Sequence, residues 1–293
     1  MDKIVKALAY DNAVQISLID GKNMLEKAQQ LHKTSPLATV AMGRLLMIAS
    51  LMSADLKNDT DKISVSMKGD GPLGTIIVAG DCKGNVRCSI ENPAVSLPLR
   101  EDGKFDVPNA VGKGEISVIK DLGLKYPYMG NCEISTGEIS EDFAFYFLLS
   151  EQTPSAITPG VLLAADCAVN SAGAIIIRPL PDTSDDVLAD VEKKAFEFKN
   201  ISGMLTEHTP EIILKNVFSN AGLNITEILY PEYKCNCSRD RMNALLLSMN
   251  KNELYECLDA QGKLEIICHF CETHYIYTKE DIDKLLMAKT QEN

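Results

Sequence analysis

Two cysteine pairs decide the fold of the C-terminal part of this chain: Cys235-Asn236-Cys237 and Cys268-His269-Phe270-Cys271. Structural zinc sites draw close pairs of thiolate ligands from distant parts of a chain, because the ion prefers four soft ligands in a tetrahedron. The spacing therefore predicts that Cys235, Cys237, Cys268 and Cys271 hold one zinc ion. The competing interpretation is that the four are buried small side chains, which two tight pairs in one chain disfavour.

The first pair is C-x-C, and alternate residues of an extended segment point to the same side. The sulfurs of Cys235 and Cys237 can therefore approach each other and can both reach one ion. Rival ligands lie nearby at Cys257, His269 and His274. We expect His269 to point outward and the other two to be surface or core positions, so the all-cysteine site is the simpler choice.

The residues around the second pair predict a small strand–turn–strand module. Ile266-Ile267 and Tyr275-Ile276-Tyr277 read as two strands. Thr278, with Asp281 three residues later, predicts a capping box that begins a terminal helix.

Oxidation of such a module has a predictable result. A bound metal keeps the sulfurs deprotonated, so they stay open to oxidants, and disulfide formation would release the ion. Structural zinc contributes roughly 10–16 kcal/mol in small finger peptides, and a tail of about sixty residues has only a modest core of its own. We therefore expect oxidation to unfold the tail.

The rest of the chain predicts an α+β fold, because strands, helices and a further strand follow one another without a repeating βαβ pattern. Ser35-Pro36 starts a helix that extends to about residue 56, and Ser140 starts another that extends to about residue 151. The predicted strands are residues 62–68, 75–79, 86–90, 115–120 and 174–177.

Pro181–Asp186 is polar, acidic and proline-flanked, which is typical of a domain boundary. Helical spacing follows over residues 187–205, and Thr209-Pro210 starts a further helix that Gly222 ends. We therefore predict three parts: an N-terminal α+β domain (1–180), a helical linker (181–231) and a C-terminal zinc-binding domain (232–293).

Length and charge exclude several classes of protein. A chain of 293 residues can bury a large core without disulfides, and its net charge of −12 disfavours a sequence-independent nucleic-acid binder. We expect no signal peptide behind the N-terminus, and the most apolar segment, residues 45–54, is short for a membrane span. These observations predict a cytoplasmic protein without a membrane partner.

Several other patterns have ordinary explanations. Residues 69–74 satisfy G-x-G-x-x-G, but a strand pattern follows where a dinucleotide site needs a helix, so we predict a turn. His32 and His208 lack a neighbouring nucleophile signature, and Glu141-Asp142 suit the start of a helix. The scattered cysteines are expected to be small core residues; they are Cys82, Cys88, Cys132 and Cys167.

Taken together, the terminal cysteines and four further stretches resemble the 33 kDa heat-shock chaperone family, the redox-regulated holdases of bacteria. The resemblance covers nearly the whole chain. The four stretches are residues 69–73, 84–87, 137–147 and 150–156.

The resemblance implies an ATP-independent chaperone, not an enzyme, that is poorly active when reduced and zinc-bound. It implies that oxidation pairs Cys235 with Cys237 and Cys268 with Cys271, that zinc leaves, and that exposed apolar surface then captures unfolding client proteins. It also implies that the active form is a homodimer. The additional cysteines, including Cys257, leave open whether only the four terminal sulfurs respond to oxidants. The alternatives are a zinc-ribbon nucleic-acid binder and a thiol–disulfide oxidoreductase that uses Cys268 and Cys271.

Overall fold

A computed structural model describes residues 1–291 and divides the chain into two compact units, Met1–Lys234 (unit 1) and Cys235–Asn293 (unit 2). Both units mix helices and strands, which confirms the α+β class. Whether residues 181–231 act as a separate linker remains a prediction.

Unit 1 contains two five-stranded sheets in which neighbouring strands pair antiparallel. In spatial order, the first sheet consists of β10 (Asn224–Leu229), β1 (Lys3–Ala9), β2 (Val14–Asp20), β9 (Val169–Pro179) and β8 (Ala156–Leu163). The second sheet consists of β5 (Val86–Ile90), β4 (Thr75–Asp81), β3 (Lys62–Gly69), β6 (Gly114–Asp121) and β7 (Tyr128–Ile134). The five predicted strands are therefore confirmed as β3, β4, β5, β6 and part of β9.

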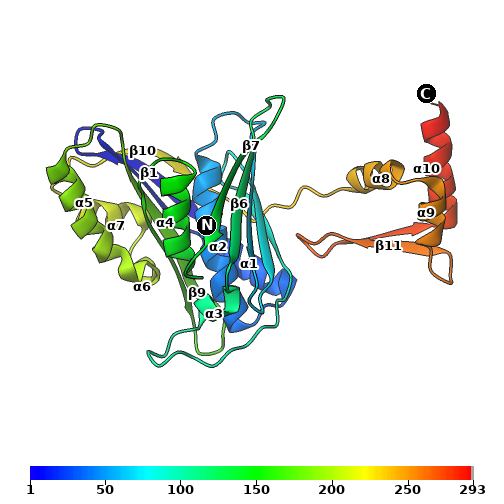
Figure 1. The fold of residues 1–293 in the computed structure, drawn as a ribbon, viewed down its shortest axis with the longest axis horizontal. Coiled ribbons are helices and arrows are strands. Elements are labelled where there is room, and N and C mark those ends of the chain that lie inside the picture. Colours follow the sequence, from blue (N-terminus) through cyan, green and yellow to red (C-terminus); the bar gives the residue numbers. More distant parts are fainter. Residues whose placement is uncertain (292–293) are drawn as a thin grey trace. The chain divides into compact units, whose positions relative to one another are not determined.

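Helix α2 (Pro36–Ala54) packs against both sheets (Figure 1). It begins where the sequence predicts, because the Ser35 hydroxyl accepts the Ala38 N–H at 3.2 Å and proline follows Ser35. It has 19 residues, 18 of which form a stretch with a mean hydropathy of 1.6, so by length and composition it could cross a membrane. Arg44 does not end the apolar stretch, because its charge is paired with Glu138 at 3.0 Å.

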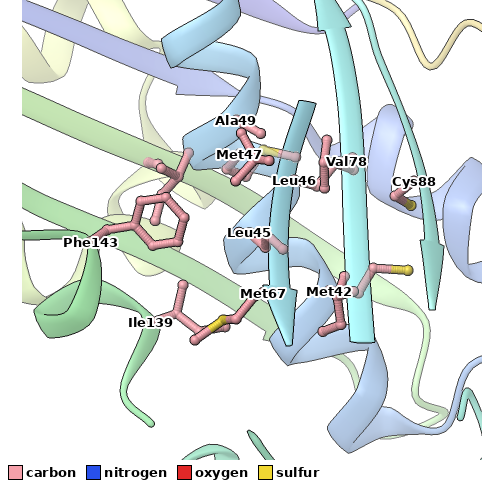
Figure 2. Close-up of a cluster of buried hydrophobic side chains, with 14 of the residues drawn as sticks. Met42, Leu45, Leu46, Met47, Ala49, Met67, Val78, Cys88, Ile139 and Phe143 are labelled. Atoms are coloured by element: carbon pink, nitrogen blue, oxygen red, sulfur yellow. The ribbon is translucent and has the colours of Figure 1, made fainter. Parts of the chain in front are cut away.

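The surroundings of α2 show that it is a core helix. Of its most apolar window, 94% is buried inside unit 1. Figure 2 shows Leu46 of α2 with Met67 and Val78 from the second sheet and Phe143 from α4 (Ile139–Leu149). A helix that is apolar on all sides is expected wherever protein covers it completely.

The other face of the first sheet is covered by helices that follow β9 (Figure 1). These are α5 (Asp185–Glu197), the short 3-10 helix Phe198–Asn200, α6 (Ile201–Glu207) and α7 (Pro210–Val217). Their apolar side chains pack on Val5, Ile16 and Ile175 of the sheet. Helix α7 ends at Val217, and Gly222, with φ +62°, lies in the following turn.

One turn confirms a sequence prediction, and a second turn corrects one. The glycine-rich residues 69–74 form the turn between β3 and β4, as predicted. Helix α4 begins at Ile139 and not at Ser140, and Asp142 does more than face the helix dipole. Its buried carboxylate accepts the N–H groups of Ser135 and Thr136 at 3.0 Å and of Gly137 at 2.9 Å, which fastens the β7–α4 turn.

Unit 1 also contains two further helices, α1 (Lys22–His32) and α3 (Val107–Val111). Unit 2 consists of α8 (Arg239–Ser248), α9 (Lys251–Glu256), β11 (Lys263–Ile267), β12 (His274–Thr278) and α10 (Lys279–Gln291).

The burial of α2 can be tested by truncating one of its side chains. Leu46→Ala should lower the free energy of unfolding by about 2–5 kcal/mol, because it leaves a cavity in a fully packed core. Leu99→Ala is the matched control, since Leu99 is 57% exposed and should change stability by less than about 0.5 kcal/mol. Urea unfolding of both variants measures the difference, and equal values would contradict the packing described for α2.

Candidate metal centre

The four cysteines of the two pairs reach one point from two local structures of unit 2. Cys235 and Cys237 lie in the extended segment before α8, whose first turn is capped by the Ser238 hydroxyl. Cys268 and Cys271 lie in the turn between β11 and β12. The strands pair antiparallel, which confirms the predicted strand–turn–strand module.

Main-chain hydrogen bonds hold the turn in place. The N–H of Cys268 donates to the Thr273 carbonyl at 3.0 Å, and the N–H groups of Cys271 and Glu272 donate to the Cys268 carbonyl at 3.2 and 2.8 Å. Glu272 has φ +56°, the left-handed conformation that closes such a turn. The turn therefore presents both of its sulfurs toward the first pair.

The sulfur atoms form a compact cluster. All four Sγ atoms lie within 4.8 Å of one another. Two contacts join sulfurs of different pairs: the Sγ atoms of Cys235 and Cys268 lie 3.7 Å apart, and those of Cys237 and Cys271 lie 3.3 Å apart. Zn–S bonds of about 2.3 Å in a tetrahedron place sulfurs about 3.8 Å apart. The cluster could therefore hold a metal ion with little movement of the ligands.

The acid–base properties of the cluster also favour a cation. Burial raises the pKa of the Cys235 thiol to about 12 and also raises the pKa of Cys268. Burial opposes ionisation of Cys271 too, but hydrogen bonds from the Thr273 hydroxyl and N–H outweigh it and lower the pKa of Cys271 to about 7. Four thiolates at this separation repel one another, and a divalent ion among them would remove that cost.

Two tyrosines support the site. The Tyr275 O–H donates to the Cys237 sulfur at 3.1 Å, and this hydrogen bond raises the pKa of Tyr275 to about 12. The buried Tyr277 ring lies beneath the Arg239 guanidinium, 4.4 Å from its centroid. Arg239 also lies 3.6 Å from Asp281, so part of its charge is already offset by that carboxylate.

The rival ligands stay outside the cluster. His269 is exposed, as expected, and His274 is exposed with its ring nitrogen 2.7 Å from Glu265. Cys257 is exposed at the end of α9. Among the described residues, the cluster therefore consists of cysteines alone.

The scattered cysteines of unit 1 differ from one another. Cys88 and Cys132 are buried, as the sequence predicts. Cys82 is half-buried, and its sulfur lies 3.6 Å from Asp59. The prediction was wrong for Cys167, which is exposed in a tight turn with φ +65°. Composition alone cannot separate a cysteine at the tip of a turn from one in a core.

Unit 2 has a small apolar core beside this cluster. Its buried hydrophobic residues are Leu246, Leu254, Tyr277 and Ile282. Local hydrogen bonds also stabilise unit 2. Thr278 and Asp281 form the predicted capping box of α10: the Thr278 N–H donates to the Asp281 carboxylate at 3.0 Å, and the Asp281 N–H donates to the Thr278 hydroxyl at 3.2 Å. A core of this size leaves the unit dependent on additional cross-links.

The comparisons with known proteins all indicate the same family. A family model described as Hsp33 protein matches residues 2–278. The 33 kDa chaperonin of Caldanaerobacter subterraneus subsp. tengcongensis is 39% identical over 287 residues, which covers 97% of this chain and 98% of that protein. The 33 kDa chaperonin of Ruminiclostridium cellulolyticum is 40% identical over 286 residues, with 97% and 98% coverage.

A solved structure agrees with these matches. The crystal structure of the 33 kDa chaperonin (heat shock protein 33 homolog) from Thermotoga maritima aligns with a TM-score of 0.89 and 33% sequence identity. The alignment covers 99% of both chains.

The ligand set can be tested by removing one sulfur. Cys268→Ser should weaken zinc binding by well over tenfold, since even the loss of groups that only orient ligands costs about 10–100-fold. Cys257→Ser is the matched control, because this exposed thiol of the same unit lies outside the cluster. Competition with a chromophoric chelator measures both affinities, and equal values would show that the ion is held elsewhere.

Proposed function

Since this chain belongs to the Hsp33 family, we propose that it is a redox-regulated, ATP-independent holdase of the cytoplasm, whose switch is the four-cysteine cluster of unit 2. The single observation that carries the proposal is the gathering of all four sulfurs within 4.8 Å in a unit with little core of its own. The relatives named above are chaperonins, which fits a protein without catalytic turnover.

In the reduced state, Cys235, Cys237, Cys268 and Cys271 bind one zinc ion as thiolates. The ion supplies a cross-link between the segment before α8 and the β11–β12 turn, and it keeps the sulfurs deprotonated. Tyr275 orients the Cys237 sulfur through its hydroxyl, and Thr273 orients Cys271.

In the oxidised state, Cys235 pairs with Cys237 and Cys268 pairs with Cys271. Each disulfide forms from two thiolates that give two electrons to one molecule of peroxide, which leaves as two hydroxide ions; the zinc ion is released without a change of charge. The short contacts of the reduced cluster join different pairs, and a disulfide needs sulfurs about 2.05 Å apart. Pairing within each segment uses the four sulfurs that would hold the ion, so unit 2 loses the cross-link between the two segments.

The surface that captures clients lies in unit 1. Residues 181–231 act as the linker, and their helices cover an apolar face of the first sheet. Phe198 and Phe218 stack with ring centroids 6.1 Å apart and are fully buried there, with Ile201 and Leu214. If the linker detaches after unit 2 unfolds, this face and the apolar sides of the helices are exposed together, and large exposed apolar patches bind other proteins. The oxidised protein pairs as a homodimer through part of the same surface, and its partners are unfolding polypeptides.

Oxidation tests the proposed switch directly. Peroxide with mild warming should release about one zinc ion per chain and form two disulfides. The treated protein should suppress aggregation of a denatured client, and the reduced protein should suppress it weakly. A variant with Cys82→Ser and Cys167→Ser should respond in the same way, because these thiols lie outside the cluster. Equal suppression by reduced and oxidised protein would reject redox control.

The covering helices can be loosened without oxidation. Phe218→Ala should destabilise the cover by about 3–5 kcal/mol, because a buried aromatic ring is lost. The reduced, zinc-loaded variant should therefore bind clients better than wild type. Phe196→Ala is the matched control, since Phe196 in α5 is 63% exposed. Light-scattering assays of client aggregation compare the variants; a destabilised but inactive Phe218→Ala would place the capture surface elsewhere.

A further inference from the structure

Residues 231–234, the last of unit 1, lie along the outer edge of β5 and make an isolated β-bridge with it. The Val86 N–H donates to the Glu232 carbonyl at 3.1 Å, and the Lys234 N–H donates to the Val86 carbonyl at 2.8 Å. The Glu232 N–H donates to the Asn85 side-chain oxygen at 2.9 Å. These bonds make a parallel bridge between Val86 and Tyr233, so the segment continues the second sheet beyond its edge.

The Tyr233 side chain satisfies the next main-chain groups of the same edge. Its O–H donates to the Cys88 carbonyl at 3.1 Å, and the Cys88 N–H donates to the phenol oxygen at 3.3 Å. His32 Nε2 lies 3.2 Å from the same phenol oxygen, within hydrogen-bond distance. The side chain of one residue therefore pairs main-chain groups that a longer neighbouring strand would otherwise pair.

The place that receives Tyr233 is a built socket between β5 and α1. We call it the β5 socket and define it by Asn85, Val86 and Cys88 of the edge together with Lys27 and His32 of α1. Tyr233 is only 4% exposed in it. The Lys27 ammonium donates to the Tyr233 carbonyl at 3.1 Å and lies 5.8 Å from the ring centroid. The socket thus recognises an extended main chain and an aromatic side chain with a polar tip.

An edge strand with unpaired N–H and C=O groups is a template for another extended chain. The bonds above pair the outward groups of Val86 and Cys88 with residues 231–234 and the Tyr233 hydroxyl. If this segment left, two donor–acceptor pairs and an aromatic-shaped site would open together. Strand addition supplies main-chain affinity in this situation, and side-chain pockets supply preference.

We propose that the β5 socket is a binding site for extended polypeptide segments that carry an aromatic residue. In the resting protein the chain's own residues 231–234 occupy it, and an unfolding client takes their place once they leave. The statement that the occupant is an unfolding client rests on the proposed holdase function. The affinity of the socket for such a peptide does not depend on that function. Tyr233 lies two positions before Cys235 in the sequence, so the occupying segment is continuous with the first metal ligand.

The test uses the full-length, reduced, zinc-loaded chain and a fluorescent peptide with the sequence of residues 229–234. Tyr233→Ala should empty the socket, so the peptide should bind this variant at least about tenfold more tightly than it binds wild type, as loss of a competing buried anchor implies. Tyr230→Ala is the matched control, since Tyr230 in the same segment is 56% exposed. A peptide in which the second tyrosine is alanine should lose binding by about tenfold or more. Fluorescence anisotropy measures each affinity.

A second measurement does not require the alanine variant to fold. Amide exchange of Val86 and Cys88 should be slow in wild type, faster in Tyr233→Phe, which keeps the ring and removes the hydroxyl, and slow again when the peptide is added. Unchanged exchange in Tyr233→Phe, or equal binding of the two peptides, would overturn the proposal. Both readouts use reduced protein, so a failure of the oxidation switch leaves them interpretable. Peptide binding without any effect of peroxide would refute the switch and not the socket.

Discussion

Thiolates crowded within 4.8 Å of one another repel unless a cation lies among them, and unit 2 is arranged around this constraint. Its apolar core has few buried residues, and its helices depend on local caps such as the Thr278–Asp281 box. The cluster joins the segment before α8 to the β11–β12 turn, which the small core alone holds only weakly. In the proposed function, the persistence of unit 2 therefore depends on sulfur chemistry more than on hydrophobic burial.

Unit 1 has the opposite balance. Helix α2 is buried between two sheets, and its packing needs no ligand. The covering helices on the first sheet and residues 231–234 on the edge of β5 both precede unit 2 in the sequence, and in the proposed function they are the parts that detach. A chain of this kind can lose the covering helices and keep the core around α2. A protein that changes its exposed surface without unfolding completely requires this property.

The features that the sequence predicted correctly are local. The Ser35 cap, the strands on either side of residues 69–74 and the Thr278 capping box each depend on residues a few positions apart. Strands β1 and β2 were not predicted, although the residues of β2 from Val14 to Leu18 alternate between apolar and polar as in a half-exposed strand. The length of α2 was predicted, but its apolar stretch was taken to begin after Arg44, although Glu138, distant in the chain, pairs with that charge.

The sequence by itself identified the four cysteines of the candidate metal centre, since cysteine type and spacing restrict which ions and redox reactions are possible there. It also determined the family, through motifs spread over nearly the whole chain. Only the tertiary structure decided that the sulfurs of the two pairs contact each other, that Asp142 fastens a turn, and that Tyr233 fills a socket made by α1 and β5. Such contacts join residues from distant parts of the chain, and no local pattern encodes which side chain fills which space.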